Sequence, residues 1–126
     1  MIPENLYYTK DHEWAKVEGD TVVVGITDHA QESLGEVTFV ELSQVGKSII
    51  QQGQIGTVES SKAASDIYSP VAGSVTQVNE KLESDPELIN KDCYGDGWIC
   101  KLRVSDPAGV KNLMNAKQYE EYLKGL

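Results

Sequence analysis

The sequence predicts a mainly β fold in which short strands build a compact barrel or sandwich, with short helices and a C-terminal helical appendage. Short apolar stretches alternate with polar residues, and turn residues interrupt them about every 8–12 residues. The chain has 126 residues, of which 40% are hydrophobic. A chain of this size can bury one core without disulfides or a structural metal, so we expect residues 1–126 to form a single domain.

Alternation between apolar and polar residues defines the expected strands. Residues 14–17 and 21–26 flank the turn Glu18-Gly19-Asp20 and form a hairpin. Within residues 36–42, the alternation places Val37 and Phe39 on the same side of a strand. Further strands are predicted at residues 47–50, 54–60, 65–69, 74–78 and 98–104.

Capping and stop residues predict the short helices. Thr27-Asp28 can cap a helix over residues 29–34, and Gly35 ends it. The Asp-Pro pairs at residues 85–86 and 106–107 are typical helix starts.

The last helix is predicted over residues 116–124. Asn115 and Gln118 form a capping box at its start. Tyr119 and Tyr122 recur at helical spacing, so we expect them to pack this helix onto the barrel.

The balance of charge narrows the range of partners. Twenty acidic residues against eleven basic ones give a formal net charge of −9. Such a field repels phosphate backbones and anionic lipid, so we expect no nucleic-acid and no membrane partner. It favours partners with basic docking surfaces, although acidity that serves only solubility is an equally simple interpretation. The N-terminus has no signal-peptide or transit-peptide features, which indicates the cytoplasm, or the mitochondrial matrix if a leader has been removed.

The residues give no support for independent catalysis. No Ser/His/Asp, Cys/His or paired-acid arrangement stands out in the sequence. Cys93 and Cys100 match neither a CxxC redox pair nor a common zinc pattern, and the chain has only two histidines. We therefore expect a non-catalytic protein without a metal site.

Lys62 is the residue whose setting suggests chemistry. It lies between the predicted strands 54–60 and 65–69, near the tip of a hairpin. A covalent carrier needs a primary amine that is exposed, fixed at its base and free at its tip, and a hairpin turn provides all three. The small neighbours Ser60, Ser61 and Ala63 leave room for a modifying enzyme. On spacing and composition alone, an ordinary solvated turn lysine remains the commoner interpretation.

The segment Glu59-Ser-Ser-Lys-Ala-Ala-Ser-Asp66 resembles the lipoylation site of glycine cleavage H proteins, where a Glu-Ser-x-Lys-Ala-x-Ser-Asp pattern surrounds the modified lysine. The resemblance continues, in order, along nearly the whole chain. It includes Tyr8-Thr-Lys-Asp-His-Glu-Trp14, Val24-Gly-Ile-Thr-Asp-His-Ala-Gln31, Phe39-Val-Glu-Leu42, Pro86-Glu-Leu-Ile-Asn90, Tyr94-Gly95, Gly97-Trp98 and Ser105-Asp106-Pro107.

This resemblance implies a lipoyl/biotinyl-type barrel-sandwich hybrid with lipoic acid attached covalently to Lys62. It also implies that Glu59, Ser60, Ser61 and Ala63 form the surface recognised by a lipoyl/octanoyl transferase or lipoate ligase. Ser61 departs from the valine usual before the lysine, and Cys93 departs from a common proline. Only Ser61 lies in the turn that the attaching enzyme must read.

Other carriers fit these residues less well. Biotin carriers flank their lysine with methionines, whereas Ser61 and Ala63 flank Lys62. The lipoyl domains of 2-oxoacid dehydrogenase complexes usually carry Asp-Lys-Ala, are shorter and are commonly joined to long linkers. This chain has Ser-Lys-Ala, extra helical segments and no linker-like tract.

By resemblance, the chain shuttles the aminomethyl group of glycine from a pyridoxal-phosphate glycine decarboxylase to a tetrahydrofolate-dependent aminomethyltransferase. A dihydrolipoamide dehydrogenase then reoxidises the carrier. Glu13 and Asp66 are the candidates for pairing with the amine of the loaded arm, and the alternative is that they make only turn hydrogen bonds. A second functional interpretation is an H-like protein that mainly donates or relays lipoyl groups to other lipoyl-dependent complexes.

Overall fold

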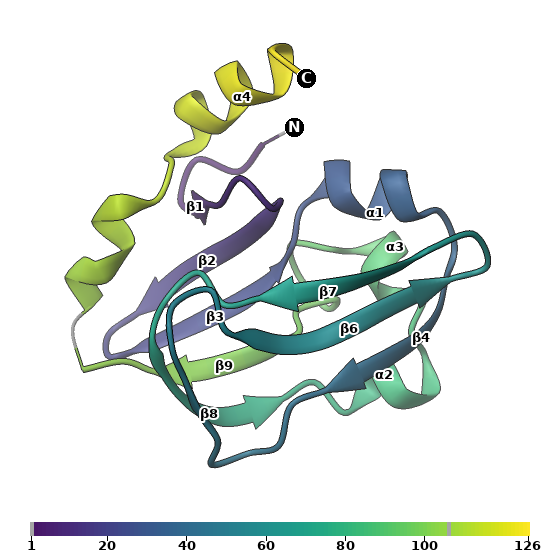
Figure 1. Ribbon diagram of the computed structural model, residues 1–126, viewed down its shortest axis with the longest axis horizontal. Coiled ribbons are helices and arrows are strands. Elements are labelled where there is room, and N and C mark those ends of the chain that lie inside the picture. Colours follow the sequence, from purple (N-terminus) through teal and green to yellow (C-terminus); the bar gives the residue numbers. More distant parts are fainter. Residues whose placement is uncertain (1, 106) are drawn as a thin grey trace.

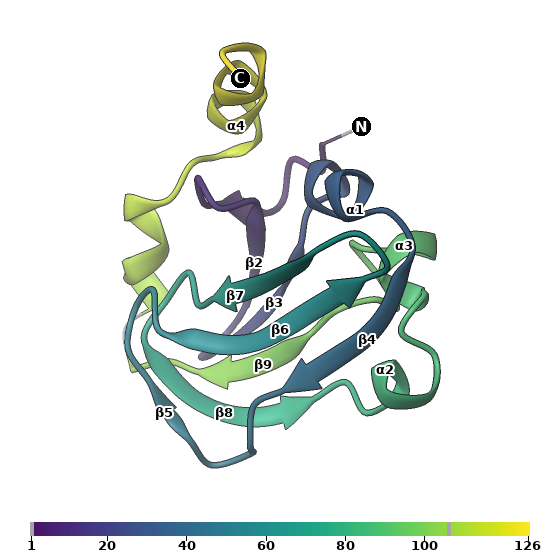
Figure 2. The ribbon, with the colours of Figure 1, turned by 45° about the vertical axis from the view of Figure 1, so that its right-hand side comes forward.

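The computed structural model describes residues 2–105 and 107–126, whose strands form two antiparallel sheets (Figure 1). The six-stranded sheet has the order β1-β2-β3-β9-β8-β5, and the three-stranded sheet has the order β4-β6-β7. The strands are β1 (Tyr7–Tyr8), β2 (Glu13–Glu18), β3 (Thr21–Ile26), β4 (Val37–Leu42), β5 (Ser48–Ile49), β6 (Gln54–Ser60), β7 (Ala64–Tyr68), β8 (Gly73–Val78) and β9 (Cys100–Arg103). Figure 2 shows the smaller sheet lying across the larger one.

Short helices fill the connections between the strands. They are α1 (Asp28–Leu34), α2 (Lys81–Ser84), α3 (Leu88–Lys91), the 3-10 helix η1 (Pro107–Asn112) and the C-terminal α4 (Ala116–Lys124). Thr27 caps α1, as predicted, and its hydroxyl accepts the backbone N–H of Ala30. The predicted capping box between Asn115 and Gln118 is present at the start of α4.

The main core fills the space between the two sheets. Val22 and Val24 enter it from β3, while Val40 and Val58 enter it from β4 and β6. Burial of these alternate residues fixes the register of each strand, since a slip of one residue would expose them. The barrel-sandwich architecture predicted from the sequence is therefore confirmed.

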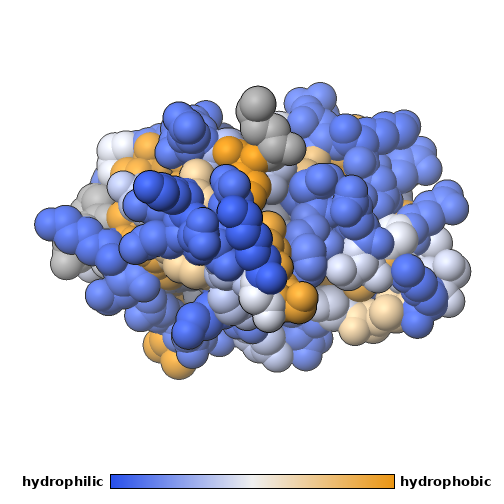
Figure 3. Space-filling view, turned by 90° about the horizontal axis from the view of Figure 1, so that it is seen from above, coloured by the Kyte–Doolittle hydropathy of each residue, from blue (hydrophilic) through white to orange (hydrophobic). Residues whose placement is uncertain are grey.

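A second, smaller cluster covers the other side of β1–β3. Tyr8 stacks on Tyr119 of α4 with ring centroids 4.7 Å apart. The other buried members of the cluster are Leu6, Trp14 and Val23. The prediction that Tyr119 packs α4 onto the sheets is thus confirmed. Seen from the end that carries both termini, hydrophilic side chains dominate and leave a narrow apolar band between them (Figure 3).

Strand β4 differs from the simple alternation predicted for it. The register shifts between Val37 and Phe39, so that Val37 is buried whereas Phe39 is 53% exposed. The prediction that both side chains share one side is wrong, because a β-bulge adds a residue to the alternation. The sequence pattern does not predict strand β1 or helix α2, and Asp106 of the second Asp-Pro pair lies outside the described residues. Among the described residues, no helix is long and apolar enough to cross a membrane.

Candidate functional site

Lys62 lies in the turn of the β6–β7 hairpin, which projects at one end of the three-stranded sheet (Figures 1 and 2). The last strand pair before the turn is Glu59 opposite Ala64. Ser60 closes the turn: its backbone N–H donates to the Ala63 carbonyl at 2.8 Å. Its hydroxyl accepts the N–H groups of Ala63 at 3.2 Å and Lys62 at 3.4 Å. The base of Lys62 is therefore fixed by the backbone and hydroxyl hydrogen bonds of Ser60, while the lysine itself is exposed.

The residues predicted around Lys62 are brought together by this hairpin. Ser61 and Ala63 are exposed on either side of the lysine, and Glu59 and Ser60 are half-buried at the end of β6. Both residues that flank Lys62 in the turn have small side chains. An enzyme that modifies the lysine therefore meets little steric hindrance there.

Gly35 supplies the surface against which the Lys62 side chain lies. This glycine ends α1 with φ +78°, a conformation that residues with a Cβ rarely adopt. A Cβ at position 35 would lie 3.1 Å from Lys62 Cε and 3.6 Å from its Nζ. The absence of a side chain at Gly35 thus leaves room for the aliphatic stem of the lysine.

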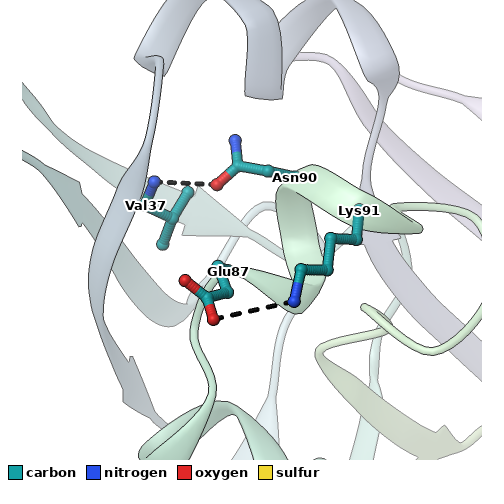
Figure 4. Close-up of polar contacts among 4 residues, drawn as sticks. All are labelled: Val37, Glu87, Asn90 and Lys91. Carbon is teal, nitrogen blue, oxygen red and sulfur yellow. Dashed lines mark hydrogen bonds and ion pairs between the residues drawn. The ribbon is translucent and has the colours of Figure 1, made fainter.

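Asn90 of α3 holds the connection between α1 and β4 on both sides of Gly35. Its Oδ1 accepts the Val37 N–H at 2.8 Å (Figure 4). Its Nδ2 donates to the Gly35 carbonyl at 2.8 Å and to Gln31 Oε1 at 2.9 Å. Figure 4 also shows the ion pair between Lys91 of α3 and Glu87, the N-cap residue of this helix.

Glu13 is a buried carboxyl group at the junction of the two sheets. It belongs to β2 and is 2% exposed. Thr9 donates its hydroxyl to Oε1 at 2.7 Å, and the backbone N–H of Tyr68 in β7 donates to Oε2 at 3.0 Å. Burial raises the pKa of Glu13 to about 7, although the two hydrogen bonds act in the opposite direction. Glu13 also lines a cleft of about 400 Å³ that includes Tyr8, Ser69 and Met114.

Asp66 occupies a different position from Glu13. It is exposed on β7, and its Oδ1 accepts bonds of 3.2 Å from Gln54 Nε2 and from Thr57 Oγ1. It is not among the described residues that line the Glu13 cleft. The backbone partner of Glu13, Tyr68, comes two residues later on the same strand, about 7 Å away. Asp66 therefore belongs to β7 and Glu13 is hydrogen-bonded to it, but the two acids do not line the same cleft.

Known proteins match this chain over nearly its full length. The family described as Glycine cleavage H-protein matches residues 6–126. The chain belongs to this family. A glycine cleavage system H protein from Symbiobacterium thermophilum is 53% identical over 98% of this chain and 96% of its own length. Another from Thermus thermophilus is 51% identical with the same coverage. The crystal structure of a glycine cleavage system H protein from Mycobacterium marinum matches with a TM-score of 0.89 and 37% identity, covering 99% of this chain and 100% of that one.

The family membership predicted from the sequence is therefore confirmed, and the protein is a carrier of the glycine cleavage system. Members of this family are non-catalytic carriers with covalently attached lipoate. The residues of the hairpin fit such a group, because Lys62 offers an exposed amine on a fixed turn. The space above Gly35, which a Cβ would crowd, accommodates the stem that leads to this amine.

Sequence reasoning missed the two residues that support Lys62 from outside the hairpin. The sequence predicts Gly35 as a helix stop, and its positive φ follows from that role, but its contact with Lys62 depends on tertiary structure. Asn90 lies 53 residues from Val37 and 55 from Gly35 along the chain. Only its place in the Pro86-Glu-Leu-Ile-Asn90 stretch of the family resemblance signals it.

Proposed function

We propose that residues 1–126 act as one carrier domain in which Lys62 holds the lipoyl group through an amide at Nζ. The observation that carries this proposal is the setting of Lys62, on a turn closed by Ser60 and beside the bare backbone of Gly35. The rigid base limits where the arm begins, and the exposed tip leaves it free to move. Glu59, Ser61 and Ala63, together with Ser60, form the surface that the attaching enzyme recognises.

As a member of its family, the chain serves the glycine cleavage system as a carrier between enzymes. It takes the aminomethyl group of glycine from the pyridoxal-phosphate glycine decarboxylase to the tetrahydrofolate-dependent aminomethyltransferase. Dihydrolipoamide dehydrogenase then restores the oxidised carrier. When bound, the lipoyl group would supply the disulfide that takes up this cargo, and it would be left as a dithiol after the cargo is transferred. The protein itself supplies tethering, which raises the local concentration of the cargo at each docked enzyme.

The attachment site is tested by intact mass and peptide mapping after incubation with a lipoate ligase, lipoic acid and ATP. We expect wild-type protein to gain one lipoyl group on Lys62 and Lys62→Ala to gain none. Lys47→Ala is the matched control, because Lys47 is also an exposed lysine beside a turn glycine. Labelling of another lysine, or no labelling of wild-type protein under conditions that label a control carrier, would contradict the proposal.

Glu13 and Asp66 are proposed to contact the amine of the loaded arm. Support for Glu13 comes from its buried carboxyl group, which lines a cleft and whose pKa is about 7. Asp66 lies outside this cleft, and its part in the proposal is supported by its exposed place on the lysine-bearing hairpin. A cationic amine nearby would favour the ionised form of Glu13. The resulting ion pair would hold the amine in the cleft, away from bulk water.

This role is tested by the rate at which the loaded protein releases formaldehyde and ammonia. Glu13→Gln combined with Asp66→Asn should release them faster than wild type. Glu18→Gln, an exposed acid on the same strand as Glu13, is the control and should leave the rate unchanged. An unchanged rate in the double variant would leave both acids with only the hydrogen bonds described above.

We also propose that this carrier works in the cytoplasm, which its bacterial relatives support. Fractionation of cells that express the protein with an antibody tag would test this location. Recovery in the membrane or extracellular fraction would contradict it.

A further inference from the structure

We propose that Asn90 is a positioning residue for Lys62, acting from a helix outside both sheets to set the direction in which the lysine leaves the hairpin. The inference rests on Lys62 being the attachment site, as proposed above. Among the described residues, the hydrogen-bond partners of Asn90 do not include the Lys62 amine. It acts through two neighbours, Gly35 and Val37, each of which leads to the same lysine.

The first route runs through Gly35 and the stem of the lysine. The Asn90 Nδ2 group holds the Gly35 carbonyl at 2.8 Å. The position that a Cβ of Gly35 would occupy lies 3.1 Å from Lys62 Cε and 3.9 Å from Cδ. The Lys62 stem therefore lies beside the Gly35 backbone, whose carbonyl Asn90 holds.

The second route runs through Val37 and the turn. Asn90 Oδ1 accepts the Val37 N–H at 2.8 Å, and Val37 is the strand partner of Ser60. Ser60 in turn accepts the N–H groups of Lys62 and Ala63. Asn90 therefore fixes the start of β4, which pairs with the residue that closes the turn.

Asn90 is well placed to hold this geometry. One carboxamide makes three hydrogen bonds, to Val37, Gly35 and Gln31, and each has a length of 2.9 Å or less. Its neighbour Ile89 is fully buried in the main core and anchors the one-turn helix. A single side chain thus joins the end of α1, the start of β4 and α3.

By holding Gly35 and Val37, Asn90 should increase the fraction of protein molecules in which Lys62 is oriented for the attaching enzyme. The side chain of an unmodified lysine is short, so an attaching enzyme must find Nζ close to one place relative to the hairpin. If only a fraction of the carrier holds that pose, the apparent affinity falls by the same fraction. Loss of Asn90 should therefore raise KM for the carrier more than it lowers kcat.

The test compares Asn90→Ala with Asn79→Ala. Asn79 is the control because its carboxamide also bonds distant backbone: its Nδ2 donates to the carbonyls of Asp96 and Trp98. Asn79 is buried, whereas Asn90 is half-buried. We expect both variants to lose a similar number of degrees in melting temperature. Only Asn90→Ala should raise KM for lipoyl attachment, by about three- to ten-fold, with kcat changed less than about two-fold.

A second readout needs no lipoyl group. In unmodified protein, nuclear Overhauser contacts between the Lys62 ε-protons and the Gly35 α-protons should be strong in wild type and in Asn79→Ala. They should be weak or absent in Asn90→Ala. The inference would be overturned if Asn90→Ala and Asn79→Ala had the same KM and the same Lys62–Gly35 contacts, whether these matched wild type or were impaired equally in both variants. If wild-type protein were not lipoylated at Lys62, the proposed function would fail, while the contacts would still decide the role of Asn90.

Discussion

The two sheets of this protein are built from the same kinds of strand but differ in what covers them. Part of the six-stranded sheet is covered on both sides, by the main core and by the second cluster under α4. The three-stranded sheet contributes Val40, Val58 and Ile67 to the main core, whereas its other side carries the exposed Phe39 and Asp66. The covered sheet provides stability, and the open sheet presents the lysine.

Their charges differ in the same way. On the six-stranded sheet, Lys16 pairs with Glu18 at 3.4 Å, and Arg103 pairs with Asp20 at 3.5 Å. Strands β4, β6 and β7 contain three carboxylates and no lysine or arginine. No ion pair joins these carboxylates to any of the described residues. Two pairs of exposed charges on the larger sheet thus neutralise each other, whereas the carboxylates of the smaller sheet have no ionic partner among the described residues.

The largest expected effect lies in the second cluster. Tyr119→Ala should lower the free energy of unfolding by about 3–5 kcal/mol, because it removes a buried aromatic ring. The change also removes the hydroxyl that lies 2.8 Å from both His12 Nδ1 and Thr27 Oγ1. Urea denaturation followed by tryptophan fluorescence measures the loss.

The matched control is Phe39→Ala on the open sheet. It removes an aromatic ring that is 53% exposed, so the free energy of unfolding should change by only about 0.5 kcal/mol. Similar losses in the two variants would contradict the distinction between a covered and an open sheet.

The next effect concerns Glu13, which joins the two sheets through Tyr68. Its pKa is about 7 in the folded protein against an ordinary value of 4.5, so the folded state binds more protons between these pH values. The free energy of unfolding should therefore fall as pH rises from about 4.5 to about 7, by about 3 kcal/mol. Thermal or urea unfolding across this pH range measures the slope.

Glu13→Gln should remove this slope and make the protein more stable than wild type at a pH above the folded-state pKa of Glu13. Glu18→Gln, an exposed acid on the same strand, should leave the slope as it is. A slope that persists in Glu13→Gln would mean that other groups cause it.

Local chemistry predicts much of this architecture from the sequence. Turn residues and alternation locate the first hairpin and the β6–β7 hairpin, and the caps at Thr27 and Asn115 are present as expected. These features depend on residues close together in the chain, which is why a sequence pattern reveals them.

The remaining features depend on contacts between distant residues. The bulge that turns Phe39 outward is set by pairing between β4 and β6, and alternation alone gives no sign of it. Likewise, the carboxamide of Asn90 finds partners 53–59 residues away. Family resemblance singles out Lys62 more than its spacing does, since many turn lysines share that spacing.

A smaller effect is expected from alanine substitutions at two glycines, which distinguish backbone strain from crowding of the Lys62 side chain. Gly35→Ala and Gly19→Ala both place a Cβ at positive φ, +78° and +67°, and each should cost about 1–3 kcal/mol of unfolding free energy. The cost should be larger for Gly35→Ala, because its ψ of −153° lies in a region that is essentially restricted to glycine. A Cβ at Gly19 meets nothing within 4 Å, whereas one at Gly35 meets the Lys62 stem. Only Gly35→Ala should therefore slow lipoyl attachment as well. Equal attachment rates in the two variants would contradict a role for the Gly35 surface.

The smallest expected effect tests the contrast in charge. Asp20→Asn breaks the exposed pair with Arg103 and should cost about 0.2–1 kcal/mol of unfolding free energy at low salt. Glu41 faces Thr57, and Glu59 lies diagonally opposite, about 7–8 Å away, so the two carboxylates repel each other weakly. Glu41→Gln should then be neutral or slightly stabilising. Added salt should reduce both differences, because it screens exposed charges. If Glu41→Gln proved as costly as Asp20→Asn, Glu41 would have a favourable partner, and the open sheet would resemble the covered one in its charges.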